Sequence, residues 1–286
     1  MYKIFTCSKF IGLVLLICWL GEGAFVLNAA NSKPWLIALD VEKGISYFDD
    51  NGVQLSRAHV VSQVDVNAYS GIEFGDFDKR NNWFEVILLR KDFWFDLYPL
   101  PKPGEKSIKR IDYFRFSPAV GCEATSVSYV NYPKDRTQFS MLVEGVRTLD
   151  KKLDRLLFFE LLNIEDRKQV KVLSFDLNWD VLGSPVEVAT LGYNCNPHTI
   201  ALITNDSLHV AKVTPDGSQL NEVLTTELPK DIVVQQLRFQ GNKIYLLDDQ
   251  NQVHLWALID NKLRPLSEPV RLDSPYKIKA IALLGR

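Results

Sequence analysis

Acidic side chains alternate along one segment, Gly75 to Glu85, in a pattern that calcium sites use. Asp76 and Asp78 lie on alternate residues, so their oxygen atoms could converge on one hard cation. The next alternating residue is Arg80, whose positive charge would repel the ion. Asp and Asn are also common in tight turns for local reasons. We therefore predict no metal and no cofactor, with calcium at Asp76 and Asp78 as the alternative.

The same segment resembles the FG-GAP repeat of integrin-type β-propellers, in which a strand leads into a Gly-Asp-x-Asp loop that holds calcium. The matching residues are Gly75, Asp76 and Asp78, and the glycine expected at the sharp bend of that loop is missing. The resemblance implies a repeat of the β-propeller superfamily, FG-GAP-like or WD-repeat-like, and identifies no specific family.

Two carboxylates, Glu73 and Glu187, fall on strands that would line the channel of such a fold. Glycoside hydrolysis needs two carboxyl groups roughly 5–9 Å apart, so this pair defines a possible hydrolase. Either carboxylate could equally face channel water. The sequence has no Gly-x-Ser-x-Gly motif, no His/Cys spacing for zinc and no phosphate-binding glycine loop. We expect a binding module without enzymatic activity, with a glycan-active hydrolase as the alternative.

Short extended segments, separated by turns, must position these residues. The order strand, tight turn, strand recurs about every fifty residues. Helical periodicity is not sustained; even Thr148 to Ile164, where it is briefly mimicked, fits a strand better. The strongest turns are Asp50-Asn51-Gly52, Pro101 to Gly104, Asn163 to Asp166, Pro215-Asp216-Gly217 and Asp260-Asn261.

These repeats predict an all-β fold, a five-bladed β-propeller in which each blade has four strands, a to d, counted outward from the centre. The first unit, 35–61, lacks its strand a, and the final segment, 277–284, would supply it and close the ring. Six blades are the alternative, if 56–70 contains further strands. His209 and His254 occupy the same place in strand c of two consecutive units. The remaining units are expected at 71–116, 126–175, 186–228 and 233–272.

The N-terminal residues, 1–29, have the pattern of a secretory signal peptide. Lys3 and Lys9 precede the uncharged run Phe10 to Leu20, and small residues follow as far as Ala29. The run is short for a bilayer span, although a signal anchor is the alternative. We predict a secreted, extracellular protein with one propeller domain over 30–286 and no other membrane contact. Asn205 begins an Asn-Asp-Ser glycosylation acceptor, which fits that route.

Charge composition limits the class of partner. The formal net charge of the 286 residues is −2, and no clustered basic stripe is present, so we expect no nucleic-acid partner. Hydrophobic residues make up 47% of the chain, enough for a packed core from end to end.

Loops of a propeller sort onto two faces. The b–c turns and d–a connections share what we call the first face, and the a–b and c–d turns share the opposite face. By analogy with other propellers, binding is expected on the first face or in the channel. Trp179 beside Asp180 could form an aromatic platform for a sugar or peptide, or it could pack under its loop. The predicted binding residues for a protein or glycan are His59, Arg90, Trp179, Asp180 and Tyr276.

Two further features leave alternatives open. The dense aromatic stretch around Trp94 predicts packing between blades, or a protein-binding patch if Trp94 protrudes. Cys122 and Cys195 are expected on opposite faces, about 17 Å apart across a strand. A disulfide needs Cα atoms within about 7 Å, so the expectation is that they stay unpaired.

Overall fold

The computed structural model describes residues 33–75, 84–115, 122–130, 140–147, 155–163, 168–176, 188–195, 198–204, 207–213 and 220–284. Within these ranges the regular elements are β-strands and one short 3₁₀ helix, η1 (Val66–Ala68). The prediction of an all-β chain is therefore confirmed for the described residues.

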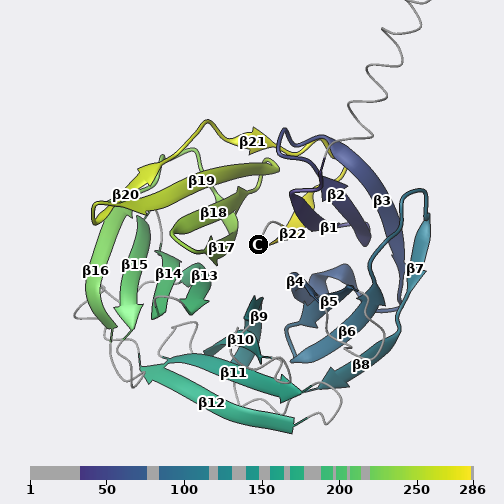
Figure 1. Ribbon diagram of the computed structural model, residues 1–286, viewed down its shortest axis with the longest axis horizontal. Coiled ribbons are helices and arrows are strands. Elements are labelled where there is room, and N and C mark those ends of the chain that lie inside the picture. The colour runs from purple at the N-terminus through teal and green to yellow at the C-terminus, as the bar shows by residue number, and fades with distance from the viewer. Residues whose placement is uncertain are drawn as a thin grey trace, which may run out of the picture.

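Five sheets stand around a common centre (Figure 1). The innermost strand of each sheet contacts the innermost strands of its two neighbours, in the order β22, β4, β9, β13, β17 and back to β22. All strand pairs are antiparallel except one. Because neighbouring strands run in opposite directions, successive connections lie at alternate ends of each sheet.

Sheet 1 joins the two ends of the described chain. β22 (Ile278–Leu283) pairs with β1 (Leu36–Asp40), with Leu36 opposite Leu283. This is the neighbour that the sequence predicted for the final strand. The sheet continues outward through β2 (Gly44–Phe48) and β3 (Gln54–Val61), and β7 (Ser107–Lys109) adds to its outer edge in parallel with β3.

Sheet 2 corrects one strand prediction. The unit predicted over 71–116 was expected to form one four-stranded blade, with 107–116 as its single outer strand. That segment instead divides into β7, which belongs to sheet 1, and β8 (Asp112–Arg115), which belongs to sheet 2. The break has a physical cause, because Arg110 donates to the buried Asp96 and the Ile111 N–H donates to the Leu97 carbonyl. The strands of sheet 2 are β4 (Tyr69–Gly75), β5 (Glu85–Arg90), β6 (Trp94–Pro99) and β8 (Asp112–Arg115).

Segment 56–70, which could have held strands of a sixth blade, is fully described. It contains the end of β3, η1 and the first residues of β4, so no additional sheet forms there.

Sheets 3, 4 and 5 follow the predicted strand order. His209 and His254 are each the third residue of the third strand of their sheet, as expected. Sheet 3 contains β9 (Cys122–Val130), β10 (Ser140–Arg147), β11 (Arg155–Asn163) and β12 (Lys168–Asp176). Sheet 4 contains β13 (Val188–Cys195), β14 (His198–Thr204), β15 (Ser207–Val213) and β16 (Leu220–Glu227). Sheet 5 contains β17 (Val234–Gln240), β18 (Lys243–Asp248), β19 (Gln252–Ile259), β20 (Lys262–Pro265) and β21 (Val270–Arg271), the last two both pairing with β19.

Three turns on the first face share one backbone device. Lys43, Phe93 and Asn251 each directly precede the third strand of their sheet, and each has a φ near +60°. Short hairpin loops use a left-handed residue here because it turns the chain back along the twisted strand. Glycine is the usual residue at such a position. Because none of these three positions is a glycine, the sequence did not indicate that the three turns share one conformation.

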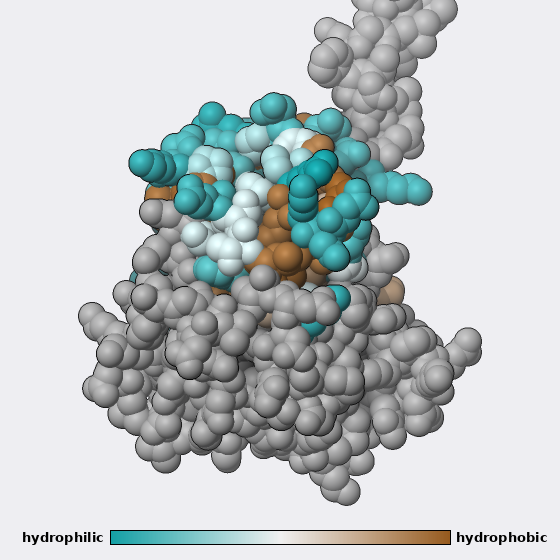
Figure 2. Space-filling model, turned by 90° about the vertical axis from the view of Figure 1, so that its left-hand side faces the viewer, coloured by the Kyte–Doolittle hydropathy of each residue, from teal (hydrophilic) through white to brown (hydrophobic). Residues whose placement is uncertain are grey.

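The outer surface of sheets 4 and 5 is mixed in character. Figure 2 shows hydrophilic residues along the upper rim of this side, with a strip of hydrophobic residues among the described ones below it. On sheet 5 and its connections, Val233, Ile259 and Leu266 are exposed hydrophobic residues.

Sheet 4 contains a buried histidine that should make stability depend on pH. The His209 ring lies 2.9 Å from the Thr225 hydroxyl, and burial lowers the pKa of His209 below its ordinary value of 6.5. The unfolded chain therefore binds a proton more readily, so stability should fall as pH drops through 6.5, by at most about 1.4 kcal/mol per pH unit. Urea unfolding between pH 7.5 and 5 should show this slope, and His209→Gln should reduce it. An unchanged slope in the variant would contradict the assignment.

Candidate functional site

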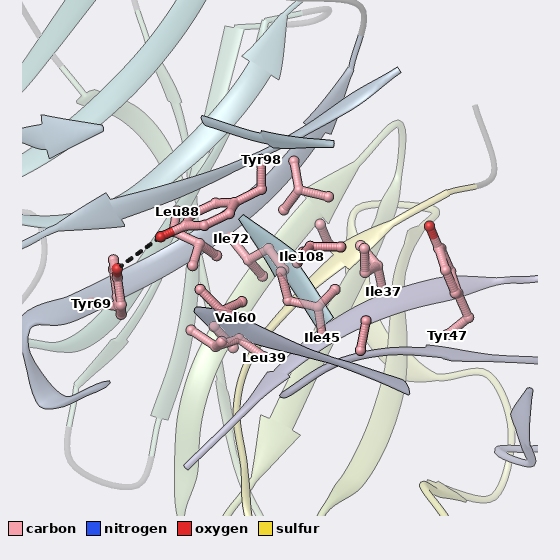
Figure 3. Close-up of a cluster of buried hydrophobic side chains, with 14 residues drawn as sticks. Ile37, Leu39, Ile45, Tyr47, Val60, Tyr69, Ile72, Leu88, Tyr98 and Ile108 are labelled. Carbon is pink, nitrogen blue, oxygen red and sulfur yellow. Dashed lines mark hydrogen bonds between the residues drawn. The ribbon is translucent and has the colours of Figure 1, made fainter. Parts of the chain in front are cut away.

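Sheets 1 and 2 pack against each other through a continuous hydrophobic cluster (Figure 3). The cluster joins β1, β2 and β3 to β4, β5 and β6, with Ile108 of β7 at the outer edge. Tyr69 and Tyr98 lie at one end of it and Tyr47 at the other. The first end meets a polar network on the first face, and the second end opens into a pocket on the opposite face.

The pocket is concave and has the character of a ligand site. Its volume is about 640 Å³, within the range of small-ligand and peptide side-chain sites. Leu55, Phe74, Leu100 and Leu284 line it and also pack against the core cluster. The pocket is thus the place where the two sheets separate and their shared core becomes accessible. The other lining residues are Lys33, Pro34, Tyr47, Ser56, Pro101 and Pro103.

The lining of this pocket is mostly apolar. None of the lining residues is an acid, a histidine or a cysteine, and the polar side chains among them are Lys33, Tyr47 and Ser56. Lys33, which is exposed, supplies its one formal charge. Three prolines give rigid apolar walls that lose little conformational entropy when a partner binds.

Tyr47 fixes the wall formed by the loop after β6. Its buried hydroxyl donates to the Pro101 carbonyl over 3.1 Å. Burial, assisted by the nearby Glu105 charge, raises the pKa of Tyr47 well above its usual value, so the phenol remains a neutral donor. This hydrogen bond ties sheet 1 to the loop of sheet 2 across the pocket floor.

An exposed aromatic ring stands next to the pocket. Phe84, 55% exposed, has its ring centroid 5.5 Å from that of the pocket residue Phe74. A large exposed aromatic residue beside a hydrophobic pocket is typical of a protein-binding hot spot. Sequence reasoning assigned this aromatic stretch to packing between blades and did not identify Phe84.

At the other end of the cluster, Arg90 has a structural partner. Its guanidinium makes two hydrogen bonds to the fully buried Asp96, at 2.8 and 2.7 Å. Arg110 donates to the same carboxylate over 2.9 Å, and so does the Tyr69 hydroxyl over 3.0 Å. Burial raises the pKa of Tyr69 well above its usual value. Arg90 thus neutralises a buried carboxylate, and its contact with a partner stays a prediction.

Tyr276 and His59 do lie toward the first face but form no joint site. The Arg57 guanidinium stands 4.3 Å from the centre of the Tyr276 ring and also pairs with the buried Asp40 at 2.7 Å. His59 is exposed and lies within β3, where its N–H donates to the Lys106 carbonyl. The predicted strand Val53 to Val61 matches β3, and β7 pairs with its outer edge.

The innermost strands share a buried ion pair, and Glu73 is one of its two members. Glu73 of β4 is 7% exposed, with a carboxylate oxygen 4.0 Å from the Arg238 guanidinium of β17. Arg238 also donates to the carbonyls of Ile281 in β22 and Ile72 in β4. Gln236 of β17 accepts from the Ile281 N–H over 2.5 Å. These side chains join three inner strands. Glu73 is therefore placed as a structural residue, beside the cation that links those strands.

Several predicted residues lie outside the described ranges. They include the second carboxylate of the hydrolase hypothesis, the aromatic platform, the calcium alternative, the glycosylation acceptor and the signal peptide: Glu187, Trp179, Asp180, Asp76, Asp78, Asn205 and residues 1–29. In the part of the chain that is described, no cluster of His, Cys, Asp and Glu could hold a metal ion. Cys122 is the first residue of β9 and Cys195 the last of β13, at the strand ends expected for them.

The first face also contains a repeated aspartate that sequence reasoning missed. Asp40 and Asp248 each end the second strand of a sheet, and each accepts hydrogen bonds from the N–H groups two and four residues ahead. Asp40 then pairs with Arg57, and Asp248 lies 2.8 Å from the His254 ring. A hydrophobic run ending in aspartate, four residues before the next strand, was the available signal.

No known protein family and no curated protein matches this sequence. Solved structures do resemble it. The N-terminal part of BBS1, in a complex with ARL6, aligns with a TM-score of 0.44 and 11% identity over 83% of this chain and 63% of its own. The Dos1 propeller aligns with a TM-score of 0.41 and 12% identity over 83% and 56%. A polycomb repressive complex 2 chain of Chaetomium thermophilum aligns with a TM-score of 0.41 and 9% identity over 73% and 50%.

The chain thus spans between half and about two thirds of the length of these solved chains. Within the described ranges, no helix has the length and apolar character needed to cross a bilayer.

Proposed function

We propose that this chain is a secreted five-bladed β-propeller, closed by β22, that binds a protein partner through the pocket between sheets 1 and 2. The observation that supports this function most is the pocket's composition, a mostly apolar lining with one cation and no carboxylate. Buried hydrophobic pockets that accept an anchor side chain provide most of the affinity of many protein interfaces.

The residues that line the pocket indicate which chemical groups of a partner it would accept. An aliphatic or aromatic side chain would enter between Leu55, Phe74 and Leu100, and a backbone carbonyl or carboxylate would lie toward Lys33. Phe84, exposed beside Phe74, would add contact area at the edge. A glycan fits this lining less well, because sugar hydroxyls need several polar groups for hydrogen bonds.

A pocket-filling substitution tests the proposal. Peptides selected from a displayed random library on the mature chain should be rich in large apolar residues. Ser56→Trp fills the pocket and should weaken their binding at least tenfold, a loss of about 1.4 kcal/mol. Val53→Trp, on the neighbouring exposed position outside the lining, is the matched control and should bind normally. Equal binding by both variants, or selective binding of a glycan blocked by Ser56→Trp, would contradict the proposal.

A further inference from the structure

The outer part of sheet 2 has a second surface with the composition of an interface. Trp94 of β6 and Tyr113 of β8 lie with ring centroids 5.6 Å apart. The Arg110 guanidinium stands 4.5 Å from the Tyr113 ring, and the Arg115 guanidinium 5.7 Å from the Trp94 ring. Tyr113 and Ile111 are about half exposed. Trp, Tyr and Arg are the residues most enriched in binding hot spots. We call these residues the aromatic–arginine patch.

Strand register places the patch residues on one side of the sheet. Trp94 is opposite Arg115, and Asp96 is opposite Tyr113, so the side chains of these four residues share one face. On that face Asp96 is fully buried and Trp94 is half-buried, whereas Tyr113 and Arg115, on the outermost strand, are exposed. The intervening pair, Phe95 and Phe114, takes the other face, where the two rings stack at 4.8 Å and are buried.

The patch adjoins an open strand edge. β8 (Asp112–Arg115) is the last strand of sheet 2, and no strand within the described ranges pairs with its outer side. Such an edge presents backbone groups that an extended segment can pair with. The Tyr113 N–H of this edge donates to the Asp112 carboxylate over 2.8 Å, so a pairing segment would have to displace that carboxylate or use the neighbouring groups.

Charge indicates which segment would fit. Among residues 101–115, five cationic side chains are exposed, whereas the two acidic ones, Glu105 and Asp112, are half-buried. Glu105 is engaged by the Lys102 N–H at 3.0 Å. The local excess of positive charge contrasts with the whole chain's net charge of −2. The exposed cations are Lys102, Lys106, Lys109, Arg110 and Arg115.

We infer that the edge of β8 and the aromatic–arginine patch bind an extended acidic segment of a protein partner. The segment adds to sheet 2 as a further strand. Its alternate apolar side chains cover Trp94 and Tyr113, and its carboxylates pair with Arg115 and neighbouring cations. The backbone edge favours a peptide, which can pair with it as a further strand, over a nucleic acid, which could use only phosphate contacts and base stacking here. The inference is independent of the pocket on the opposite face.

Fluorescence anisotropy with a labelled octapeptide of alternating glutamate and valine tests this site on the mature chain. We expect saturable binding that is at least tenfold tighter than that of the matched lysine–valine peptide. Arg115→Glu and Tyr113→Ser, both at exposed positions, should each weaken it about tenfold. Lys243→Glu is the control, because it makes the same charge change at an exposed position of sheet 5 and should bind normally.

Three results would overturn the inference: equal binding of the lysine peptide, binding unaffected by Arg115→Glu and Tyr113→Ser, or tighter binding of an oligothymidylate than of the acidic peptide. Ser56→Trp should leave the acidic peptide's affinity unchanged. That variant separates a failure of this site from a failure of the pocket.

Discussion

Replacing Arg238 by alanine is expected to lower the free energy of unfolding by about 3–5 kcal/mol, because it removes a guanidinium from beside a buried carboxylate. Glu73 is 7% exposed, and the carbonyls of Ile281 and Ile72 would also lose their donor. The three strands concerned belong to sheets 5, 1 and 2. Urea denaturation of the mature chain measures the loss directly.

Controls separate the charge from the packing. Glu73→Gln keeps an oxygen that can accept from the Phe74 N–H, and in combination with Arg238→Met it removes both charges while preserving volume. This double variant should recover the part of the loss that comes from the unpaired Glu73 carboxylate, since replacing a buried pair by groups of similar size is often close to neutral. The cost of leaving the Ile281 and Ile72 carbonyls without their donor should remain. A loss below about 1 kcal/mol for Arg238→Ala, the size of a surface effect, would show that the guanidinium does not hold these strands together.

Hydrogen exchange gives the same prediction a spatial test. The Ile281 N–H is held by Gln236, and the Ile281 carbonyl by Arg238. In Arg238→Ala the amides of β22 should exchange faster than those of β6, because local opening would begin at the strand that joins the chain's two ends. Uniform acceleration across all sheets would instead indicate global destabilisation without a local cause.

The strand pattern could be read from the sequence because it depends on local information. Alternation in β17 and β19, and the breaker residues between strands, place elements within a few residues of where they occur. The pairing of β22 with β1 could be predicted because one unit lacked a strand and one strand was left over. The division between β7 and β8 could not, because it depends on Arg110 reaching an aspartate on another strand.

The sites depended on contacts between distant residues and were harder to predict. Arg238 and Ile72 are 166 positions apart, and no periodicity links them. Pocket residues Leu284 and Leu55 meet only because the final strand joins the first sheet. Sequence reasoning placed binding on the first face or in the channel by analogy, whereas the pocket with described walls opens on the opposite face.

Replacing Asp96 is expected to have the second large effect on the free energy of unfolding, and that effect tests the role of Arg90. Asp96→Ala should cost about 3–5 kcal/mol, because it leaves the cation of Arg90 without the carboxylate that it was buried against. Asp96 is fully buried, and it accepts hydrogen bonds from Arg90, Arg110 and the Tyr69 hydroxyl. Thermal or urea unfolding of the variant measures the loss.

The two arginines provide the matched comparison. The Arg90 side chain is 15% exposed and that of Arg110 is 37% exposed, although both contact the same carboxylate. Arg110→Ala should cost no more than about 1 kcal/mol, as exposed ion pairs do, whereas Arg90→Ala should cost clearly more because its charge is better shielded from water. If Arg90 were instead a residue held ready for a partner, its replacement would leave stability unchanged and weaken only binding. Equal and small losses for both variants would restore that interpretation, and a large loss for Arg90 alone would assign it to the framework that separates the polar first face from the apolar pocket.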